Sequence, residues 1–518
     1  MEQLKKSVAM TEPVHAAAAH HLLQHVRHRQ RQEDLCFGLW RASQGDEHFT
    51  ALLSELVLPE AGERILQGNV SFTAGYLERV LQRARASGMG VALLHNHFTP
   101  GWQGMSDDDV DAERGRAARV LTATNLPLLG MTIATDEAWS ARFWPRTAPR
   151  TYRRQWCETV RVVGQRLRVT YHPQLRPAPA WGEELTRTVS TWGDQAQADL
   201  MRLHIGVVGL GSVGRLVAEA LARTGCQHVT FIDFDLVLRH NRDRLLGAGA
   251  KEAAARMLKV NLAQDGFMHA STCDSPRVRP VVQSVVEMPG LLAALNCDVL
   301  FSCVDRPWPR RLLNHLAYAH LIPVVDGGVL VRMRGDAFRG AEWSLRTAAP
   351  SRACLACAGA YDPALVEAER DDLLDDPGYL HGLDPDHPLR RNENVFPFCM
   401  SLAAHEVLQF IALATGLRNI PDFGDQRYHY NLGRMLSEVK RCRSECPYPS
   451  LVATGDAVYP RDTIVGFHHA AERARKESII IPPAAPTMTA YRAPQAGLWG
   501  LIRRRIRAST GTLRRIFS

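Results

Sequence analysis

Three glycines in the middle of the chain have the spacing of a phosphate-binding turn. Gly209, Gly211 and Gly214 follow the apolar stretch IGVV and open a helix-forming stretch. The first glycine permits a tight turn, the second lets backbone N–H groups approach a phosphate, and the third lets the helix pack closely on the sheet. Asp233 ends the next apolar stretch, where a carboxylate can accept hydrogen bonds from ribose hydroxyls. The pattern predicts a nucleotide site on a strand, turn, helix, strand unit without deciding which nucleotide binds.

The polar side chains that follow distinguish between two nucleotide chemistries. Asn241 and Arg244 come shortly after Asp233. Asp305 and Arg310 come after a second apolar strand, LFSCV. Hydride transfer to NAD does not use these charges, whereas nucleotidyl transfer does, because arginine neutralises a triphosphate and aspartate holds Mg²⁺. We therefore expect ATP and Mg²⁺, and an NAD-dependent Rossmann oxidoreductase is the alternative. Taken singly, Asp305 as a helix N-cap and Arg310 as a solvated residue are the plainer interpretations.

Two histidines in the N-terminal part of the chain have the spacing of metal ligands. His95 and His97 end the apolar stretch GVALL, and alternate residues of a strand share one face. Asp109, from a following helix, would be a third ligand and leave a fourth position for water, as in catalytic zinc sites. Glu33, ahead of another apolar stretch, is placed to act as general base. The alternative is a capping box, in which Ser106 and Asp109 only begin the helix.

Four of the eleven cysteines form two close pairs. Cys354 and Cys357 make a C-x-x-C pattern, and Cys442 and Cys446 make a C-x-x-x-C pattern further along. Close thiolate pairs in a cytosolic chain suit a tetrahedral structural zinc with no open coordination position. Unrelated buried cysteines are the alternative.

The central motifs together resemble the ThiF-like, ubiquitin-activating enzyme superfamily, which includes the molybdopterin-synthase adenylyltransferases. The resemblance covers about residues 185–450. It implies a Rossmann-like domain, with a mostly parallel sheet, that uses ATP to adenylate the C-terminal glycine of a ubiquitin-like or sulfur-carrier protein. The family pattern of D-x-D, N-x-x-R, lysine and D-x-x-x-x-R corresponds here to Asp233, Asp235, Asn241, Arg244, Lys251, Asp305 and Arg310.

The same resemblance implies roles for single residues. Asp233 would hold the ribose and Asp305 the magnesium. Asn241, Arg244 and Lys251 would hold the triphosphate, with Lys259 as the alternative lysine. Arg187 resembles the arginine that such enzymes insert into the partner's site, so a homodimer is expected. Some relatives capture the acyl group on a cysteine; Cys399 has the expected place, although its apolar neighbours favour a packing role.

The N-terminal motif resembles the JAMM (JAB/MPN) metalloprotease family, in which a strand glutamate is followed by H-x-H and S-x-x-D. The resemblance covers about residues 20–150 and implies an α/β zinc isopeptidase or peptidase. His95, His97 and Asp109 correspond to the zinc ligands, Glu33 to the base and Ser106 to the hydroxyl that supports the oxyanion. Fusions of a JAMM domain to a ThiF-like domain resemble prokaryotic ubiquitin-like conjugation modules, which implies a bifunctional protein and a conjugating enzyme as a further partner.

The bulk composition limits the remaining possibilities. A chain of 518 residues is long enough for two or three domains. The net charge of +8 is modest and partly concentrated in residues 503–515, so no nucleic-acid partner is expected. No apolar run approaches the length of a membrane span, and the N-terminus lacks the apolar core of a signal peptide. A cytoplasmic location is therefore the expectation.

The expected organisation is an α/β protein in three blocks. Residues 20–150 form the JAMM-like domain, residues 185–450 the ThiF-like domain, and residues 451–518 a Pro-containing linker and basic tail. A binding scaffold in which both sites have lost catalysis remains an alternative of a different class. The intact charged set around the glycine turn argues against it.

Overall fold

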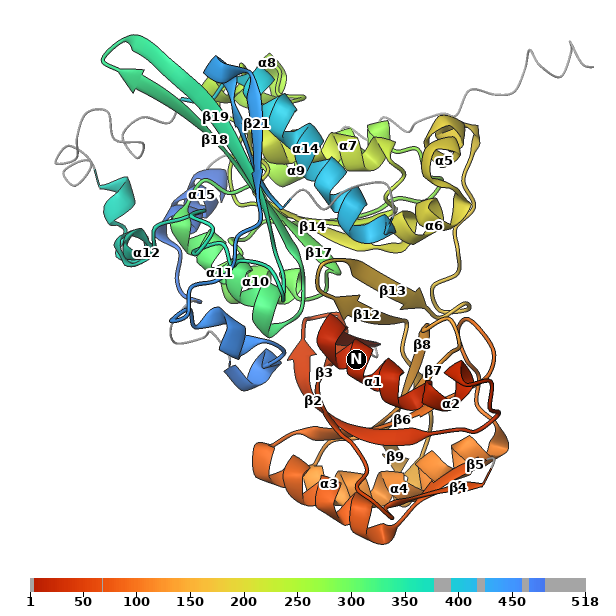
Figure 1. Ribbon diagram of the computed structural model, residues 1–518. Helices are drawn as coiled ribbons and strands as arrows, with labels where there is room; N and C mark the ends of the chain where they lie inside the picture. Colours follow the sequence, from red (N-terminus) through yellow and green to blue (C-terminus); the bar gives the residue numbers. More distant parts are fainter. Residues whose placement is uncertain (1–3, 68, 377–392, 417–423, 459–464, 480–518) are drawn as a thin grey trace, which may run out of the picture. The chain divides into compact units, whose positions relative to one another are not determined.

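The computed structural model describes residues 4–67, 69–376, 393–416, 424–458 and 465–479. The chain divides into two compact units, Met1–Glu477 and Ser478–Ser518. The first unit contains two large sheets, one built from residues 5–171 and one from residues 204–438 (Figure 1). The basic stretch of residues 503–515 lies outside the described residues.

The N-terminal sheet has nine strands with both parallel and antiparallel pairs. In order across the sheet they are β11 (Gln155–Trp156), β8 (Trp139–Trp144), β7 (Leu128–Ile133), β6 (Gly90–Asn96), β2 (Leu35–Gln44), β3 (His48–Val57), β1 (Lys5–Thr11), β12 (Thr159–Val163) and β13 (Leu167–Tyr171). The sheet therefore extends beyond the predicted limits of 20 and 150 at both ends. β12 and β13 join the sheet through β1, which pairs in parallel with both β3 and β12, whereas β11 pairs with β8 at the other edge.

Helices cover both faces of this sheet, which explains why successive residues of a central strand such as β2 are buried on both faces. The helices concerned are α1 (Glu12–Leu22), α3 (Ala74–Ser87) and α4 (Asp107–Thr124). Leu35, Phe37 and Leu39 of β2 pack under α3 and α4. Cys36 and Trp40 of the same strand lie on the opposite face, in the cluster that includes α1. Smaller elements complete this part: α2 (Gln24–Arg27), β4 (Arg64–Gln67), β5 (Asn69–Phe72), β9 (Arg146–Ala148) and β10 (Thr151–Tyr152).

The second sheet has a parallel part that continues into an antiparallel part. Its strands, in order, are β16 (Arg277–Val281), β15 (His228–Ile232), β14 (His204–Val208), β17 (Val299–Ser302), β18 (Val324–Arg334), β19 (Ala337–Ala348), β20 (Asp425–His429) and β21 (Arg434–Glu438). The pairs from β16 to β18 are parallel, and those from β18 to β21 are antiparallel. The carboxyl ends of the parallel strands therefore meet at one edge, where such sheets bind ligands.

Helices cover both faces of the parallel part. One face packs against α7 (Ser212–Arg223), α9 (Lys259–Ala270) and α14 (Phe396–Thr415), and the other against α10 (Met288–Ala294) and α11 (Pro307–Ala319). Ile205 and Val207 of β14 lie on the first face, and Val208 lies on the second. The surrounding elements are η1 (Glu183–Leu185), α5 (Thr186–Trp192), α6 (Asp194–Arg202), η2 (Arg239–Asn241), α8 (Ala250–Ala254), α12 (Pro363–Arg370), η3 (Leu373–Asp375) and η4 (Tyr430–Leu432).

Helix α14 corrects one expectation from the sequence. Among the described residues it is the one helix long and apolar enough to cross a membrane by length and composition, whereas no apolar run of that length was expected. Half of its apolar window is buried, and Leu402, Val407 and Phe410 lie in the core cluster shared with α7 and β14. Because a core helix has the same composition, this packing accounts for its hydropathy.

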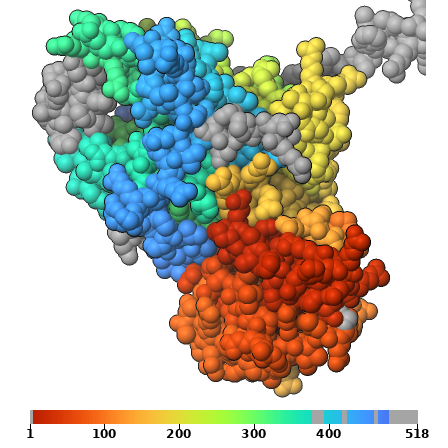
Figure 2. Space-filling view, viewed as in Figure 1, coloured from red at the N-terminus to blue at the C-terminus, as the bar shows by residue number. Residues whose placement is uncertain are grey.

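The predicted linker region is partly packed onto the rest of the first unit. Figure 2 shows the blue segment that contains η6 (Gly455–Val458) directly against the red N-terminal part of the chain. There a Cβ at Gly455 would lie 2.1 Å from the carbonyl oxygen of Ala42 in β2. η5 (Tyr448–Leu451) precedes this contact, and α15 (His469–Ile479) follows it. The described residues after 450 therefore belong, as far as Glu477, to the first unit.

Candidate nucleotide pocket and metal centres

The glycine turn joins β14 to α7 at the carboxyl edge of the parallel strands. Gly209 has a φ of +86°, and a Cβ there would lie 2.6 Å from the carbonyl oxygen of Cys303, so this position requires glycine. A Cβ at Gly214 would lie 1.9 Å from the Gly209 oxygen, which fits the expected close packing of helix on strand. Gly211 faces open space, and α7 begins at the next residue. An anion can therefore approach the turn and the positive end of the helix dipole.

Two aspartates at the end of β15 form a network with a lysine. Asp233 accepts hydrogen bonds from the N–H of Leu210 at 2.6 Å and from the N–H of Asp235 at 2.7 Å. Burial and the charge of Asp235 raise the pKa of Asp233 to about 6. Lys259, the first residue of α9, donates to Asp235 Oδ2 at 2.7 Å. Burial lowers the pKa of Lys259, but the charges of the two aspartates outweigh burial and raise it, so the lysine is a stable cation.

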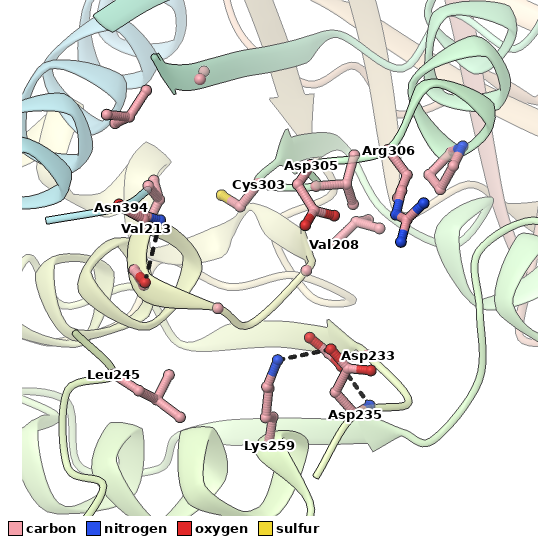
Figure 3. Close-up of a pocket in the computed structure, with 18 of the residues that line it drawn as sticks. Val208, Val213, Asp233, Asp235, Leu245, Lys259, Cys303, Asp305, Arg306 and Asn394 are labelled. Carbon is pink, nitrogen blue, oxygen red and sulfur yellow. Dashed lines mark hydrogen bonds and ion pairs between the residues drawn. The ribbon is translucent and has the colours of Figure 1, made fainter. Parts of the chain in front are cut away.

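These residues line one cavity of about 510 Å³. Figure 3 shows Asp305, from the end of β17, directed into this space opposite Lys259, Asp233 and Asp235. Of the predicted nucleotide residues, the cavity lining brings together Gly209, Gly211, Asp233, Asp235, Asn241, Arg244, Asp305 and Arg310. Carboxylates that can hold Mg²⁺ and cations that can neutralise phosphates therefore share one site.

Arg310 lines the cavity but is already bound by the protein. Its Nε donates to Asp326 Oδ1 at 3.0 Å, and its Nη2 donates to the carbonyl oxygen of Gly327 at 3.1 Å. Asp326 is fully buried and also accepts a hydrogen bond from Ser302 Oγ at 2.7 Å. The position of this guanidinium is thus fixed by neighbouring strands, and much of its charge is balanced.

Two residues assigned by family resemblance lie elsewhere. Lys251 is exposed on α8 and does not line the cavity, whereas the alternative, Lys259, does. The chain turns between α8 and α9, so nearness in sequence to Arg244 does not bring Lys251 to the site. Arg187 is exposed on α5 and does not line the cavity of its own chain.

The cavity also contains residues that sequence reasoning missed. Arg306, Asn394 and His468 line it, from three distant parts of the chain. Arg306 directly follows Asp305, and its position next to a predicted ligand was the available signal. Nothing in the local sequence marks Asn394 or His468, since both reach the cavity only through the tertiary fold.

Cys399 is held in a way that does not activate its thiol. Its Sγ donates to Asn394 Oδ1 at 2.6 Å, and burial raises its pKa to about 11. Cys303 is also close to the cavity, and burial raises its pKa as well. Neither thiol has the depressed pKa of a reactive cysteine.

The two N-terminal histidines converge with Asp109 at the end of β6. His95 Nε2 lies 3.2 Å from His97 Nε2 and 3.4 Å from Asp109 Oδ1, and His97 Nε2 lies 3.3 Å from Asp109 Oδ2. The three ligand atoms all lie within 4.8 Å of one another. Burial and the charge of Arg142 lower the pKa of His95 to about 3, so His95 is a neutral imidazole, the form that binds metals. The set fits a zinc ion with an open position.

Glu33 and Asp34 both precede β2, but their environments differ. Asp34 is fully buried and pairs with Arg64. The Asp34 N–H donates to Asn96 Oδ1 at 2.7 Å, which ties the start of β2 to the residue between the two histidines. Glu33 is half-buried, and burial and the charge of Asp109 raise its pKa. Glu33, rather than Asp34, therefore offers its carboxyl group to the cluster of His95, His97 and Asp109. A raised pKa suits a general base.

Ser106 is the N-cap of α4. Its Oγ accepts a hydrogen bond from the Asp109 N–H at 3.1 Å, and its own N–H donates to Asp109 Oδ2 at 2.9 Å. The capping box considered as an alternative is therefore present. Capping and metal binding do not compete, because the same cap orients Asp109 toward His95 and His97.

The four paired cysteines also converge. Their sulfur atoms lie within 4.8 Å of one another, with 3.6 Å between Cys354 Sγ and Cys446 Sγ. The Cys357 N–H donates to Cys354 Sγ at 3.3 Å, and the Cys354 N–H donates to Cys442 Sγ at 3.2 Å. N–H···S bonds favour thiolates, so the donor set fits a closed tetrahedral zinc site.

Comparison with known proteins identifies the second half of the molecule. The model of the ThiF family matches residues 184–448, just over half of the chain. The chain belongs to the ThiF family. The matched residues contain the whole second sheet, the glycine turn and the four paired cysteines, and they begin after the N-terminal sheet. This membership does not favour the NAD-dependent oxidoreductase alternative.

Several curated proteins are similar to part of this chain. The tRNA threonylcarbamoyladenosine dehydratase of Escherichia coli K12 is 42% identical over 160 residues, 29% of this chain and 54% of the relative. The molybdopterin-synthase adenylyltransferase of the same organism is 30% identical over 142 residues, 27% of this chain and 54% of the relative. The adenylyltransferase and sulfurtransferase UBA4 of Yarrowia lipolytica is 31% identical over 143 residues, 27% of this chain and 35% of the relative.

The chain therefore spans about half, or less, of the length of these relatives. Among solved structures, E. coli MccB with ATP is similar with a TM-score of 0.40 and 13% identity, covering 52% of this chain and 74% of that chain.

Proposed function

We propose that the ThiF-family part of this chain is an ATP-dependent adenylyltransferase. One observation carries the proposal: a single cavity at the carboxyl edge of the parallel strands combines the glycine turn, the Asp233 carboxylate and the Lys259 ammonium group opposite Asp305. Relatives that are named adenylyltransferases support the same reaction class.

In this proposal each part of the cavity has one task. The glycine turn binds phosphate oxygens, Asp233 accepts hydrogen bonds from the ribose, and Arg244 and Lys259 balance the charge of the triphosphate. Asp305 would hold Mg²⁺, which supplies further charge stabilisation for the departing pyrophosphate. A carboxylate oxygen of the substrate attacks the α-phosphorus, the bond to the β-phosphate oxygen breaks, and an acyl-adenylate and pyrophosphate form.

The proposed substrate is the C-terminal glycine of a ubiquitin-like or sulfur-carrier protein. The wider proposal includes a cytoplasmic homodimer, in which the exposed Arg187 reaches the partner's cavity, and a conjugating enzyme that accepts the activated carrier. The four paired cysteines would hold a structural zinc. Because Cys399 has a raised pKa, the proposal contains no thioester step.

ATP–pyrophosphate exchange tests the adenylation. The full chain is incubated with ATP, candidate carriers, Mg²⁺ and labelled pyrophosphate, and the C-terminus of the carrier is examined by mass spectrometry. We expect carrier-dependent exchange and an adenylate on the terminal carboxylate. Absence of exchange with every carrier that binds the protein would instead support the scaffold alternative.

A second candidate function, zinc-dependent peptide or isopeptide hydrolysis, is favoured by the N-terminal cluster. His95, His97 and Asp109 would hold the zinc, which when bound supplies a polarised water. Glu33 would take a proton from that water and deliver it to the leaving nitrogen. Ser106 would support the oxyanion through its hydroxyl while it caps α4.

The two proposed activities would act on the C-terminus of the same carrier protein. Hydrolysis would expose or release a carrier C-terminus, and adenylation would activate the same carboxylate. A carrier with a C-terminal extension is the test substrate. We expect the zinc-loaded chain to cleave the extension and the Glu33→Gln variant to retain zinc without cleaving it. Equal cleavage by both proteins would remove the hydrolase from the proposal.

A further inference from the structure

The order of the parallel strands fixes a direction across the proposed nucleotide pocket. β14, β15 and β16 lie side by side, and their carboxyl ends line the cavity in that order. The glycine turn follows β14, where phosphates would bind, and Asp233 follows β15, where the ribose would bind. Because the ribose lies between phosphate and base, the base is directed toward the residues after β16. Those residues are Gln283, Ser284 and Val285, which line the cavity.

A residue from outside the family match lies at this end of the cavity. His468 lines the cavity together with residues 283–285, and its Nδ1 forms a 2.9 Å hydrogen bond with Ser284 Oγ. The side chain of His468 is 8% exposed. Its ring packs edge-to-face on Phe234, with 5.1 Å between ring centroids, and Phe234 is the residue after Asp233. His468 therefore lies next to both the ribose position and the loop after β16.

The segment that carries His468 is tied to that loop at several points. The Gly466 N–H donates to the carbonyl oxygen of Val286 at 3.0 Å. Arg475 of α15 makes two 2.8 Å contacts with the Glu287 carboxylate and donates to Gln283 Oε1 at 3.3 Å. The segment and the loop after β16 are thus one packed structure, although they lie far apart in the sequence.

We propose that His468 forms one wall of the base subsite and helps bind the purine, with residues 465–477 as the segment that holds it at the cavity. The inference rests on the proposed function, since it assumes that the cavity binds ATP. His468 lines the cavity next to Ser284, while its ring also packs on Phe234 and Trp308. The hydrogen bond to Ser284 fixes the loop that would face the same base. The family match ends at residue 448, so this wall is a feature of this chain rather than of the matched region.

Calorimetry on the full chain tests the subsite with two ligands, Mg-ATP and inorganic tripolyphosphate, which has no base. We expect His468→Ala to weaken Mg-ATP binding about 5- to 100-fold, the range for loss of one base–aromatic contact. Tripolyphosphate binding should change less than about twofold, because its site at the glycine turn is intact. His468→Phe, which keeps a flat ring, should bind Mg-ATP more tightly than His468→Ala.

Two variants on α15 complete the test. Arg475→Ala removes the tie to Glu287 and Gln283 and should weaken Mg-ATP binding but not tripolyphosphate binding. Lys476→Ala is the matched control, because this side chain is 71% exposed and pairs with Glu472 on its own helix. Unchanged Mg-ATP affinity in both His468→Ala and Arg475→Ala would overturn the subsite alone. Equal loss of both ligands would also overturn it, and absence of Mg-ATP binding by the unaltered chain would overturn the proposed function as well.

Discussion

The nucleotide cavity and the histidine cluster are built in different ways. Every ligand of the cluster comes from residues 95–109, and Glu33 enters through the strand that pairs with β6. The cavity is lined by residues from positions as distant as Gly209, Asp305, Asn394 and His468. A site built from one short stretch can be recognised from residue spacing. A site built from several strand ends along a sheet edge can be recognised only when the fold is known as well.

The charges of the two regions also differ. The cluster contains a neutral His95 beside Asp109, which suits a bound cation. The cavity contains Lys259 and Arg310, each already paired with a carboxylate. Paired cations keep their place before a ligand arrives, so less reorganisation is needed when a polyanion binds. We infer that the two regions are prepared for ligands of opposite charge, and substitutions in each should separate their activities.

The largest effect is expected for Asp305→Ala. Loss of the carboxylate that we propose holds Mg²⁺ would remove several kcal/mol of charge stabilisation, so ATP–pyrophosphate exchange should fall about 10³-fold. Cleavage of an extended carrier should stay unchanged. Asp336→Ala, in the exposed turn between β18 and β19, is the control and should leave both rates unchanged. Loss of both activities in the Asp305 variant would contradict separate sites.

Glu33→Gln should produce the reverse pattern. Removal of the proposed general base should lower the proposed hydrolysis about 10²-fold or more, with exchange unaffected. Zinc content, measured by elemental analysis, should not change, because Glu33 is not a ligand. A fall in exchange of similar size would show that the two regions are coupled.

Substitution of Lys259 should have a smaller effect, a loss of ATP affinity, that substitution of Lys251 should not share. Lys259→Ala removes a charge-assisted hydrogen bond and a cation from the cavity, so ATP affinity should fall about 10- to 100-fold. Lys251→Ala should bind ATP within about twofold of the unaltered chain, because Lys251 is exposed and outside the cavity. Equilibrium binding of ATP to both variants shows which lysine contacts the nucleotide. A larger loss of affinity for Lys251→Ala would mean that Lys251 reaches the nucleotide after all.

The smallest effect is expected for Ser106→Ala. Loss of the capping hydrogen bond to the Asp109 N–H should lower the free energy of unfolding by about 0.5–2 kcal/mol, measured by urea denaturation. Ser106→Asn keeps a capping group and is the matched control. A drop in hydrolysis for the alanine variant that the asparagine variant does not restore would assign the hydroxyl a role at the oxyanion.

The sequence was sufficient where short-range geometry decides the outcome. Gly209 and Gly214 have the turn and packing roles that their spacing predicted. His95 at the end of β6 and His97 just after this strand lie on one side, as their i, i+2 spacing predicted. The sequence was insufficient where tertiary packing decides which residues reach the cavity. The position of Lys259 depends on the turn between α8 and α9, and Arg310 is held by Asp326 of a neighbouring strand.

The extent of the N-terminal sheet also depends on tertiary packing. β1 joins β3 and β12 by parallel pairing, which links strands far apart in the chain. Residue spacing contains no information on such pairing, and four strands of the sheet, β1, β11, β12 and β13, lie outside the predicted range of 20–150. His468 likewise lies inside residues 451–518, which the sequence predicted as a linker and tail, and its contacts with Ser284 and Phe234 depend on the tertiary fold.

The most direct test of the adenylation pocket is calorimetric titration of the full chain with ATP, with and without Mg²⁺, and with NAD in parallel. We predict magnesium-dependent ATP binding with a dissociation constant between about 1 μM and 1 mM, and no binding of NAD. Binding of NAD without magnesium-dependent binding of ATP would contradict a pocket built for acyl activation.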